Sequence, residues 1–450
     1  MKKFMMAAGA LSLLAFGACK KDTQESAPKP VNAADVVLPS GSTLPNVIPA
    51  GDNYILQSGG TYYLNGKTYV DSLGTITINS GVTIQGIKKA TPAEASALVV
   101  TRGATINALG DSTAPIIFTS AEATPAVGDW GGVVILGRAQ TNQNQLGADP
   151  VIEGISLPTL PAGINVGYGS ASTTYNTESS GIFRFVRILY AGAAISDANE
   201  LNSLTLGGVG SGTELHHVEA AYGADDAFEF FGGTVNASYL VSLNTNDDIF
   251  DFDFGYTGRL QFLLGVRRGS GTGAAYADAN GIESDNNGSG NGSLLPLTQA
   301  KISNLTLISG SSSAAFTGTL NGARLRRATN YIIKNSVLLG YNNGVSFEGG
   351  ADAYVANFTD NFVHGFTTAF TGVTALPSDN TTATGANPQT TFGISNPYGT
   401  GALFQPYPTA TSPVRTGADF SGTSGFIGVT YRGAFPQGSK SWLNTWTVGL

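Results

Sequence analysis

Two short acidic segments carry the strongest chemical pattern in the sequence. Residues 225–231 read DDAFEFF, and residues 247–253, at an offset of 22, read DDIFDFD. Because successive side chains of a strand point to opposite faces, the phenylalanines are expected on one face and the intervening acids on the other. Strands stacked about 4.8 Å apart would bring like charges together, which is destabilising. The acidic face therefore requires a partner.

Three partners satisfy such a face. Calcium takes six to eight oxygen ligands from flexible carboxylates and carbonyls. Arginines on a neighbouring segment would pair with the acids, and a plain solvated acidic stripe would need only water. The sequence leaves these three alternatives open. The candidate metal ligands are Asp225, Glu229, Asp247, Asp251, Asp253, Glu283 and Asp285.

The elements that position these acids are short β-runs separated by glycine and asparagine. Residues 81–84 (GVTI) return 22 residues later as residues 103–106 (GATI), and a looser polar-or-aromatic element recurs at Phe185, His217, Asn304 and Asn335. A period of 20–25 residues with β-branched runs and Gly/Asn turns is typical of a parallel β-solenoid. A sandwich needs no such repeat, and a propeller blade needs about 40 residues. We therefore predict an all-β, right-handed parallel β-helix, with loop insertions at 138–180 and 269–298 bordering its binding face.

Composition excludes several classes of protein. The chain has 450 residues, of which 60 are glycine, one is cysteine and 12 % are charged, and its formal net charge is −8. A chain of this charge cannot neutralise a run of phosphates, so we expect no nucleic-acid partner. One cysteine excludes a disulfide scaffold and a cysteine-based zinc finger.

The N-terminus resembles a bacterial lipoprotein signal peptide. Lys2 and Lys3 precede a short apolar stretch that ends before Cys19, although Phe16 stands where leucine is usual. An ordinary secretory signal is the alternative. We expect residues 1–18 to be removed, Cys19 to carry lipid (palmitate), residues 19–50 to form a flexible tether, residues 51–372 to form the β-helix and residues 373–450 to form a loop-rich C-terminal extension and cap. The protein would then be anchored by lipid to the outer membrane of the cell envelope.

Several runs in the body resemble a family of uncharacterised Bacteroidota envelope lipoproteins. The resemblance spans roughly residues 55–350 and implies a right-handed parallel β-helix in the envelope, but no established activity. The runs that carry it are residues 115–120 (PIIFTS), 128–138 (GDWGGVVILGR), 204–210 (LTLGGVG), 225–233 (DDAFEFFGG) and 283–286 (ESDN).

The function expected from these features is non-catalytic binding of a glycan or a partner protein. The alternative is a calcium-dependent polysaccharide lyase, because acids beside Arg324 and Arg326, the candidate catalytic bases, match the layout of β-helical lyases without any lyase motif. Glu348 and Tyr256 are candidate ligand-binding residues. A third expectation is a structural accessory subunit of an outer-membrane transport complex.

Overall fold

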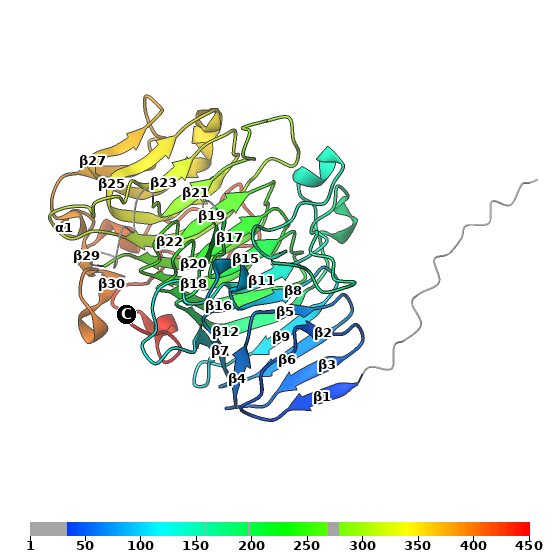
Figure 1. Cartoon of the computed structure of the whole chain (residues 1–450). Coiled ribbons are helices and arrows are strands. Elements are labelled where there is room, and N and C mark those ends of the chain that lie inside the picture. The colour runs from blue at the N-terminus through cyan, green and yellow to red at the C-terminus, as the bar shows by residue number, and fades with distance from the viewer. Residues whose placement is uncertain (1–33, 157, 197–198, 269–278) are drawn as a thin grey trace, which may run out of the picture.

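The computed structural model describes residues 34–450 except 157, 197–198 and 269–278. The expected signal peptide, Cys19 and the first part of the expected tether lie outside the described residues. One sheet of 26 strands winds into a parallel β-helix, which confirms the predicted fold (Figure 1). Each coil contributes to three faces, A, B and C, because each strand pairs in parallel with the equivalent strand of the next coil.

The three faces are built as follows. Face A contains β1 (Asp35–Leu38), β3 (Asn53–Leu56), β6 (Thr75–Asn79), β9 (Thr105–Leu109), the first halves of β12 (Gly181–Leu189), β16 (Glu214–Ala221), β18 (Ala237–Leu243), β20 (Arg259–Val266) and β22 (Lys301–Ile308), and β24 (Ile332–Lys334) and β26 (Phe358–Thr359). Face B contains β4 (Thr61–Leu64), β7 (Thr83–Gly86), β10 (Ile116–Ser120), the second halves of those five long strands, the first parts of β25 (Val337–Phe347) and β27 (Phe362–Thr371), and β28 (Thr381–Thr384). Face C contains β2 (Val47–Ile48), β5 (Lys67–Val70), β8 (Ala97–Val100), β11 (Gly132–Leu136), β15 (Leu204–Gly207), β17 (Phe228–Phe231), β19 (Phe250–Asp253), β21 (Ile282–Ser284), β23 (Asn321–Leu325) and the second parts of β25 and β27.

Few elements lie outside the coils. They are the hairpins β13 (Ala194–Ser196) with β14 (Asn199–Glu200) and β29 (Ile394–Asn396) with β30 (Gln405–Pro408), the short helix α1 (Pro388–Phe392), and the 3-10 turns η1 (Pro92–Glu94), η2 (Gln143–Leu146), η3 (Thr173–Tyr175), η4 (Ala351–Asn357), η5 (Gly401–Leu403), η6 (Pro413–Arg415) and η7 (Ser441–Leu443). No helix in the described part of the chain has the length and apolar character needed to cross a membrane.

The looser repeat marks the bend between faces A and B. Phe185, His217, Tyr239 and Phe262 occupy this bend in successive coils, and each has a positive φ, from 48° to 59°. A left-handed backbone is unfavourable for such residues. Their rings stack at centroid distances of 4.4, 4.4 and 5.1 Å, which offsets part of that cost. Asparagine, which tolerates this conformation, takes the position in the next coils.

The core inside the coils is apolar, as the alternation predicts. Phe228 stacks on Phe250 with ring centroids 5.4 Å apart, and Phe230 stacks on Phe252 at 5.1 Å. All four side chains are fully buried. Phe254 differs from the prediction, because β19 ends at Asp253 and Phe254 adopts a left-handed conformation with φ of 53°, which turns its ring out of the core face.

The first repeat pair, residues 81–84 and 103–106, lies on two different faces. Thr83 lies opposite Thr61 on face B, whereas Thr105 lies opposite Thr75 on face A. The two segments are therefore not stacked on each other. They look alike because each follows a glycine at a left-handed corner, Gly81 with φ of 73° and Gly103 with φ of 87°, where a strand begins.

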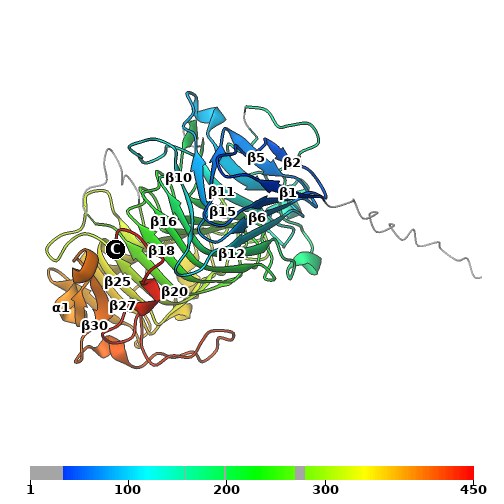
Figure 2. The same ribbon diagram turned by 90° about the horizontal axis from the view of Figure 1, so that it is seen from below.

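The boundaries of the β-helix also differ from the prediction. β1 starts at Asp35 and pairs with β3, so residues 35–50 belong to the first coil rather than to a tether. At the other end β28 pairs with β27 and extends the coils to Thr384. Residues 425–450 contain no strand, and they pack back along the outside of the β-helix beside β18 and β20 (Figure 2). Ala434, Leu443 and Trp446 pack against face B, whereas Gln261, on face A, donates from Nε2 to the Ile427 carbonyl at 2.8 Å.

Candidate functional site

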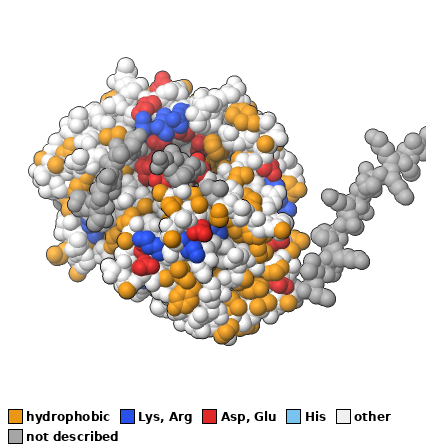
Figure 3. All heavy atoms as spheres, viewed as in Figure 1, with side chains coloured by type: hydrophobic (Ala, Val, Ile, Leu, Met, Phe, Trp, Pro, Cys, Tyr) orange, Lys and Arg blue, Asp and Glu red, His pale blue; other side chains and the backbone are white. Residues whose placement is uncertain are grey.

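An acidic hollow of about 320 Å³ lies on the outside of face C, over the ends of β15, β17, β19 and β21. Figure 3 shows acidic side chains gathered in this depression, with basic side chains beside it. The hollow is walled by the insertion at 138–180 and by the loop before β15, which agrees with the expectation that insertions border the site. Its lining residues are Ile152, Glu153, Glu200, Asn202, Asp225, Asp226, Glu229, Phe231, Asp247, Asp248, Asp251, Asp253, Phe254 and Glu283.

The floor of the hollow is a stack of outward-facing side chains from consecutive coils. Glu229 lies opposite Asp251, Asp251 opposite Glu283, and Glu283 opposite Arg324. The predicted stacking of the two acidic segments is therefore confirmed. Carboxylate oxygens of Asp226, Glu229 and Asp251 lie within 4.8 Å of one another, which is close enough to share a cation.

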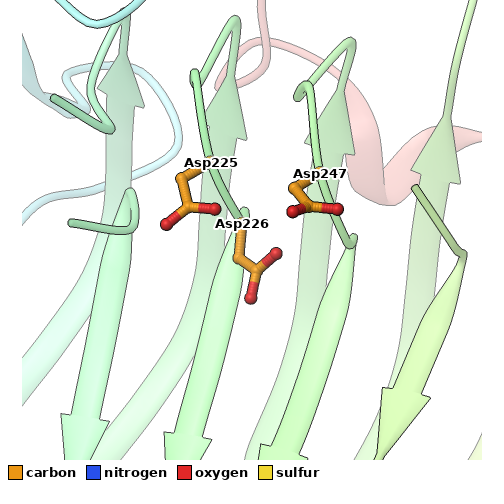
Figure 4. Close-up of side chains that lie close together, drawn as sticks. All are labelled: Asp225, Asp226 and Asp247. Carbon is orange, nitrogen blue, oxygen red and sulfur yellow. The ribbon is translucent and has the colours of Figure 1, made fainter. Parts of the chain in front are cut away.

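A second group of carboxylates sits at the turn before these strands. Figure 4 shows the side chains of Asp225, Asp226 and Asp247 converging from neighbouring coils, and their oxygens also lie within 4.8 Å of one another. Asp226 Oδ1 accepts a hydrogen bond from the Asp248 backbone N–H at 2.7 Å, and Asp248 Oδ1 accepts one from the backbone N–H of Asn280.

This turn position forms a ladder that is neutral in later coils. Asn280 Oδ1 accepts from the backbone N–H of Asn321 at 3.2 Å, and Asn321 Oδ1 accepts from Asn343 Nδ2 at 3.1 Å. Asparagine side chains satisfy such a ladder without charge. The coils under the hollow use Asp226 and Asp248 at the same position, and they are only 7 % and 6 % exposed. Two buried ionisable carboxyl groups are thus placed where hydrogen bonding alone does not need them.

Burial dominates the electrostatics of the hollow. It raises the pKa of Asp226, Glu229 and Asp251 well above the usual range, and the neighbouring carboxylates raise it further. A buried carboxylate without a positive partner is costly. Burial therefore favours the neutral forms of these groups, whereas a bound cation would favour their ionised forms.

Two oxygens in the hollow lack a hydrogen-bond donor within the described ranges. They are Asp251 Oδ1 and Asn202 Oδ1. Asn202 is only 3 % exposed, and its Nδ2 donates to Glu229 Oε2. Sequence reasoning did not find Asn202, because a single asparagine in an irregular loop has no pattern that distinguishes it from other turn residues.

The arginine alternative is correct for one end of the acidic face. Arg326 Nε pairs with Asp285 Oδ1 at 2.8 Å, and Arg327 Nη1 pairs with Asp285 Oδ2 at 2.7 Å. Arg326 also pairs with Glu283. Glu283 and Asp285, two of the predicted metal ligands, are therefore held by arginines.

Arg324 and Glu348, which are 24 residues apart, meet on neighbouring coils. Arg324 Nε lies 3.3 Å from Glu348 Oε1, and its Nη1 lies 3.7 Å from Glu283 Oε2. Burial alone would raise the Glu348 pKa, but hydrogen bonds from Ser346 and Arg324 lower it below its usual value. We call Arg324, Arg326 and Arg327 the arginine rim.

One expectation about a single residue is wrong. Tyr256, a candidate ligand-binding residue, is fully buried against Phe230 and Phe252, and its hydroxyl donates to the Val235 carbonyl at 2.7 Å. Asp253 stays in the lining of the hollow, where its Oδ1 accepts from the Phe254 backbone N–H at 2.7 Å. The carboxylates on the floor are buried or half-buried between the walls of the hollow.

The fold and site define a class: a parallel β-helix with an acidic hollow and an arginine rim on one face. The chain belongs to the family of pectate-lyase-like β-helix domains, which it matches over residues 49–410. No curated protein and no solved structure matched the chain significantly. Membership of the family agrees with either a binding protein or a lyase.

Proposed function

We propose that this protein is a non-catalytic binding protein of the cell envelope whose acidic hollow takes calcium and, through it, a carboxylate-bearing glycan. The observation that carries the proposal is the close group formed by Asp226, Glu229 and Asp251, in which Asp251 has an unsatisfied buried oxygen. Carboxylate and amide oxygens are the ligands that calcium prefers. Calcium held by such a group keeps positions open for carboxylates of a glycan, and the arginine rim lies beside it.

The state of the arginines favours binding over catalysis. A lyase needs a base that can give up its proton, and arginine does so only when its pKa is lowered. Although partial burial opposes the effect, Glu283 and Asp285 raise the Arg326 pKa above its usual value. Arg324 is likewise held between Glu283 and Glu348. Both candidate bases are thus stabilised in their charged form.

A calcium-dependent polysaccharide lyase is the second candidate function. The family match and the adjacency of acids and arginines on one face favour it. A lyase would release products with an unsaturated uronate, which absorb in the ultraviolet. Absorbance that grows with time on any uronate polysaccharide, and that disappears in Arg326→Lys and Arg324→Lys, would establish the lyase and overturn the non-catalytic proposal.

The binding proposal is tested with calcium and EDTA. Calcium at millimolar concentration should raise the melting temperature, EDTA should reverse the rise, and magnesium should have a smaller effect because it demands octahedral geometry. Glycan binding should then require calcium. A melting temperature that is the same in calcium and in EDTA would overturn the proposal.

The envelope location is part of the proposal and rests on the sequence before residue 34. Lipid on Cys19 would anchor the β-helix to the outer membrane, with the binding face exposed to the periplasm or the outside. Mass spectrometry of the mature N-terminus and loss of membrane association in Cys19→Ser test the anchor. Co-purification with an outer-membrane transport complex would instead support an accessory role.

A further inference from the structure

The two carboxylate groups in the acidic hollow share one residue. Asp225, Asp226 and Asp247 form the first group, and Asp226, Glu229 and Asp251 form the second. We infer that the hollow binds two divalent cations together, with Asp226 as the ligand that bridges them. This inference rests on the proposed calcium binding and extends it from one ion to a pair.

The charge of the two groups supports a pair of cations. Their five residues carry a charge of −5 when ionised, so one divalent ion leaves −3 and two leave −1. Asp248 lies outside both groups, and the buried guanidinium of Arg267 is close enough to interact with it. Glu153, Glu200 and Asp253 also line the hollow, so the five carboxylates are a lower bound on the negative charge that faces a cation.

A neutral oxygen provides an independent indication of a ligand. Asn202 Oδ1 is buried in the lining of the hollow and lacks a donor in the described part of the chain. A buried amide oxygen left unsatisfied costs about 1–3 kcal/mol. Its own Nδ2 is fixed on Glu229, a member of the second group. The amide is thus held in place, and a cation beside Glu229 would satisfy its oxygen.

The turn ladder supplies a matched pair of residues for a test. Asp226 and Asp248 occupy the same turn position in consecutive coils, and each accepts a backbone N–H from the next coil through Oδ1. Only Asp226 belongs to both carboxylate groups. Asparagine at either position keeps the accepting oxygen, as it does in the later coils, and removes one charge. Asp226→Asn should therefore disturb cation binding far more than Asp248→Asn.

Stoichiometry tests the inference directly. Native mass spectrometry and calorimetry with calcium alone should give two ions for the unaltered chain and for Asp248→Asn, and at most one for Asp226→Asn. Circular dichroism would confirm that both variants fold. One ion in the unaltered chain would overturn the pair and leave the proposed function standing, whereas no ion would overturn both. Equal loss in the two variants would overturn the bridging role of Asp226.

A spectroscopic measurement checks that the two ions are neighbours. Terbium and europium replace calcium in oxygen sites, and energy passes from terbium to europium only when both ions lie close together. A mixture of the two ions should give europium emission sensitised by terbium in the unaltered chain, and this emission should be lost in Asp226→Asn. Two ions bound without energy transfer would place them in separate sites and overturn the shared ligand.

Discussion

Replacing Asp251 with asparagine should have opposite effects on stability with and without calcium. Asp251 stacks on Glu229, and its carboxylate oxygens lie within 4.8 Å of those of Glu229 and Asp226. Two unit charges at 4.8 Å repel by about 3 kcal/mol at an effective dielectric constant near 20. Burial raises the pKa of these groups and so favours their neutral forms, which weakens the repulsion. The substitution should therefore relieve about 1–3 kcal/mol of repulsion in EDTA at pH 8.

With calcium the same substitution removes a ligand. The stabilisation by a bound ion is about 2.7 kcal/mol at 100 times the dissociation constant, and much of it should be lost in Asp251→Asn. Urea unfolding of both proteins in EDTA and in millimolar calcium measures the two effects. The variant should be the more stable protein in EDTA and the less stable one in calcium.

Asp285→Asn is the control for this experiment. Asp285 is a buried acid on the same side of the β-helix, but two arginines hold it. Its replacement removes the carboxylate that pairs with Arg327 and leaves Arg326 with Glu283 alone, which should cost about 3 kcal/mol in both conditions. If Asp251→Asn behaves like this control and destabilises the protein in EDTA, the carboxylates of β19 do not repel their neighbours and the reasoning fails.

Three further predictions concern other parts of the molecule. Arg326→Gln should lower stability by about 3 kcal/mol in urea unfolding, with or without calcium, because Glu283 and Asp285 lose a buried partner; an unchanged midpoint would show that Arg327 compensates. Burial raises the pKa of Glu219 from 4.5 to about 8, so the folded state binds this proton more tightly, and stability should fall as pH rises from about 4.5 to about 8. In Glu219→Gln that decline should be smaller, and an identical pH profile would contradict the assignment. Trp446→Ala should cost about 3–5 kcal/mol because the ring is fully buried against face B, and a loss below about 1 kcal/mol would mean that the C-terminal segment contributes little.

Local repetition made the stacking of the acidic segments predictable. The offset of 22 between residues 225–231 and 247–253 survives because the turn that joins these coils has no insertion, so Glu229 and Asp251 must meet. Arg324 lies opposite Ser346 in the next coil, which brings Glu348 within reach of its guanidinium. The similarity of residues 81–84 and 103–106 suggested a stacked pair, but the two runs lie on different faces. A glycine corner before a strand occurs on more than one face, so similar local sequence does not identify the face.

Features that depend on tertiary packing could not be predicted from the repeat pattern. Asn202 reaches the hollow from an irregular loop, and only the folded path of that loop brings it to Glu229. Tyr256 lies in a turn, where a tyrosine is often exposed. Its ring instead turns inward and packs on Phe230 and Phe252. The acids lie at the bottom of a hollow because the insertion at 138–180 forms one of its walls. The path of that insertion could not be predicted, because its sequence has no periodic pattern.

The C-terminal segment changes how the whole stack should unfold. A solenoid whose coils contact only their neighbours behaves as a one-dimensional array and can fray coil by coil. Here Asn304 Nδ2 donates to the Tyr431 carbonyl at 2.9 Å, and the Val448 N–H donates to Glu219 Oε2 at 2.9 Å, so one short segment spans coils from β16 to β22. Arg187 of β12 also donates to the Trp446 carbonyl. Opening any one of these middle coils requires release of the strand-free segment that binds the others, which couples their openings into one cooperative transition. A nascent chain can acquire this coupling only after residues 431–448 have been synthesised, long after the coils that they bind.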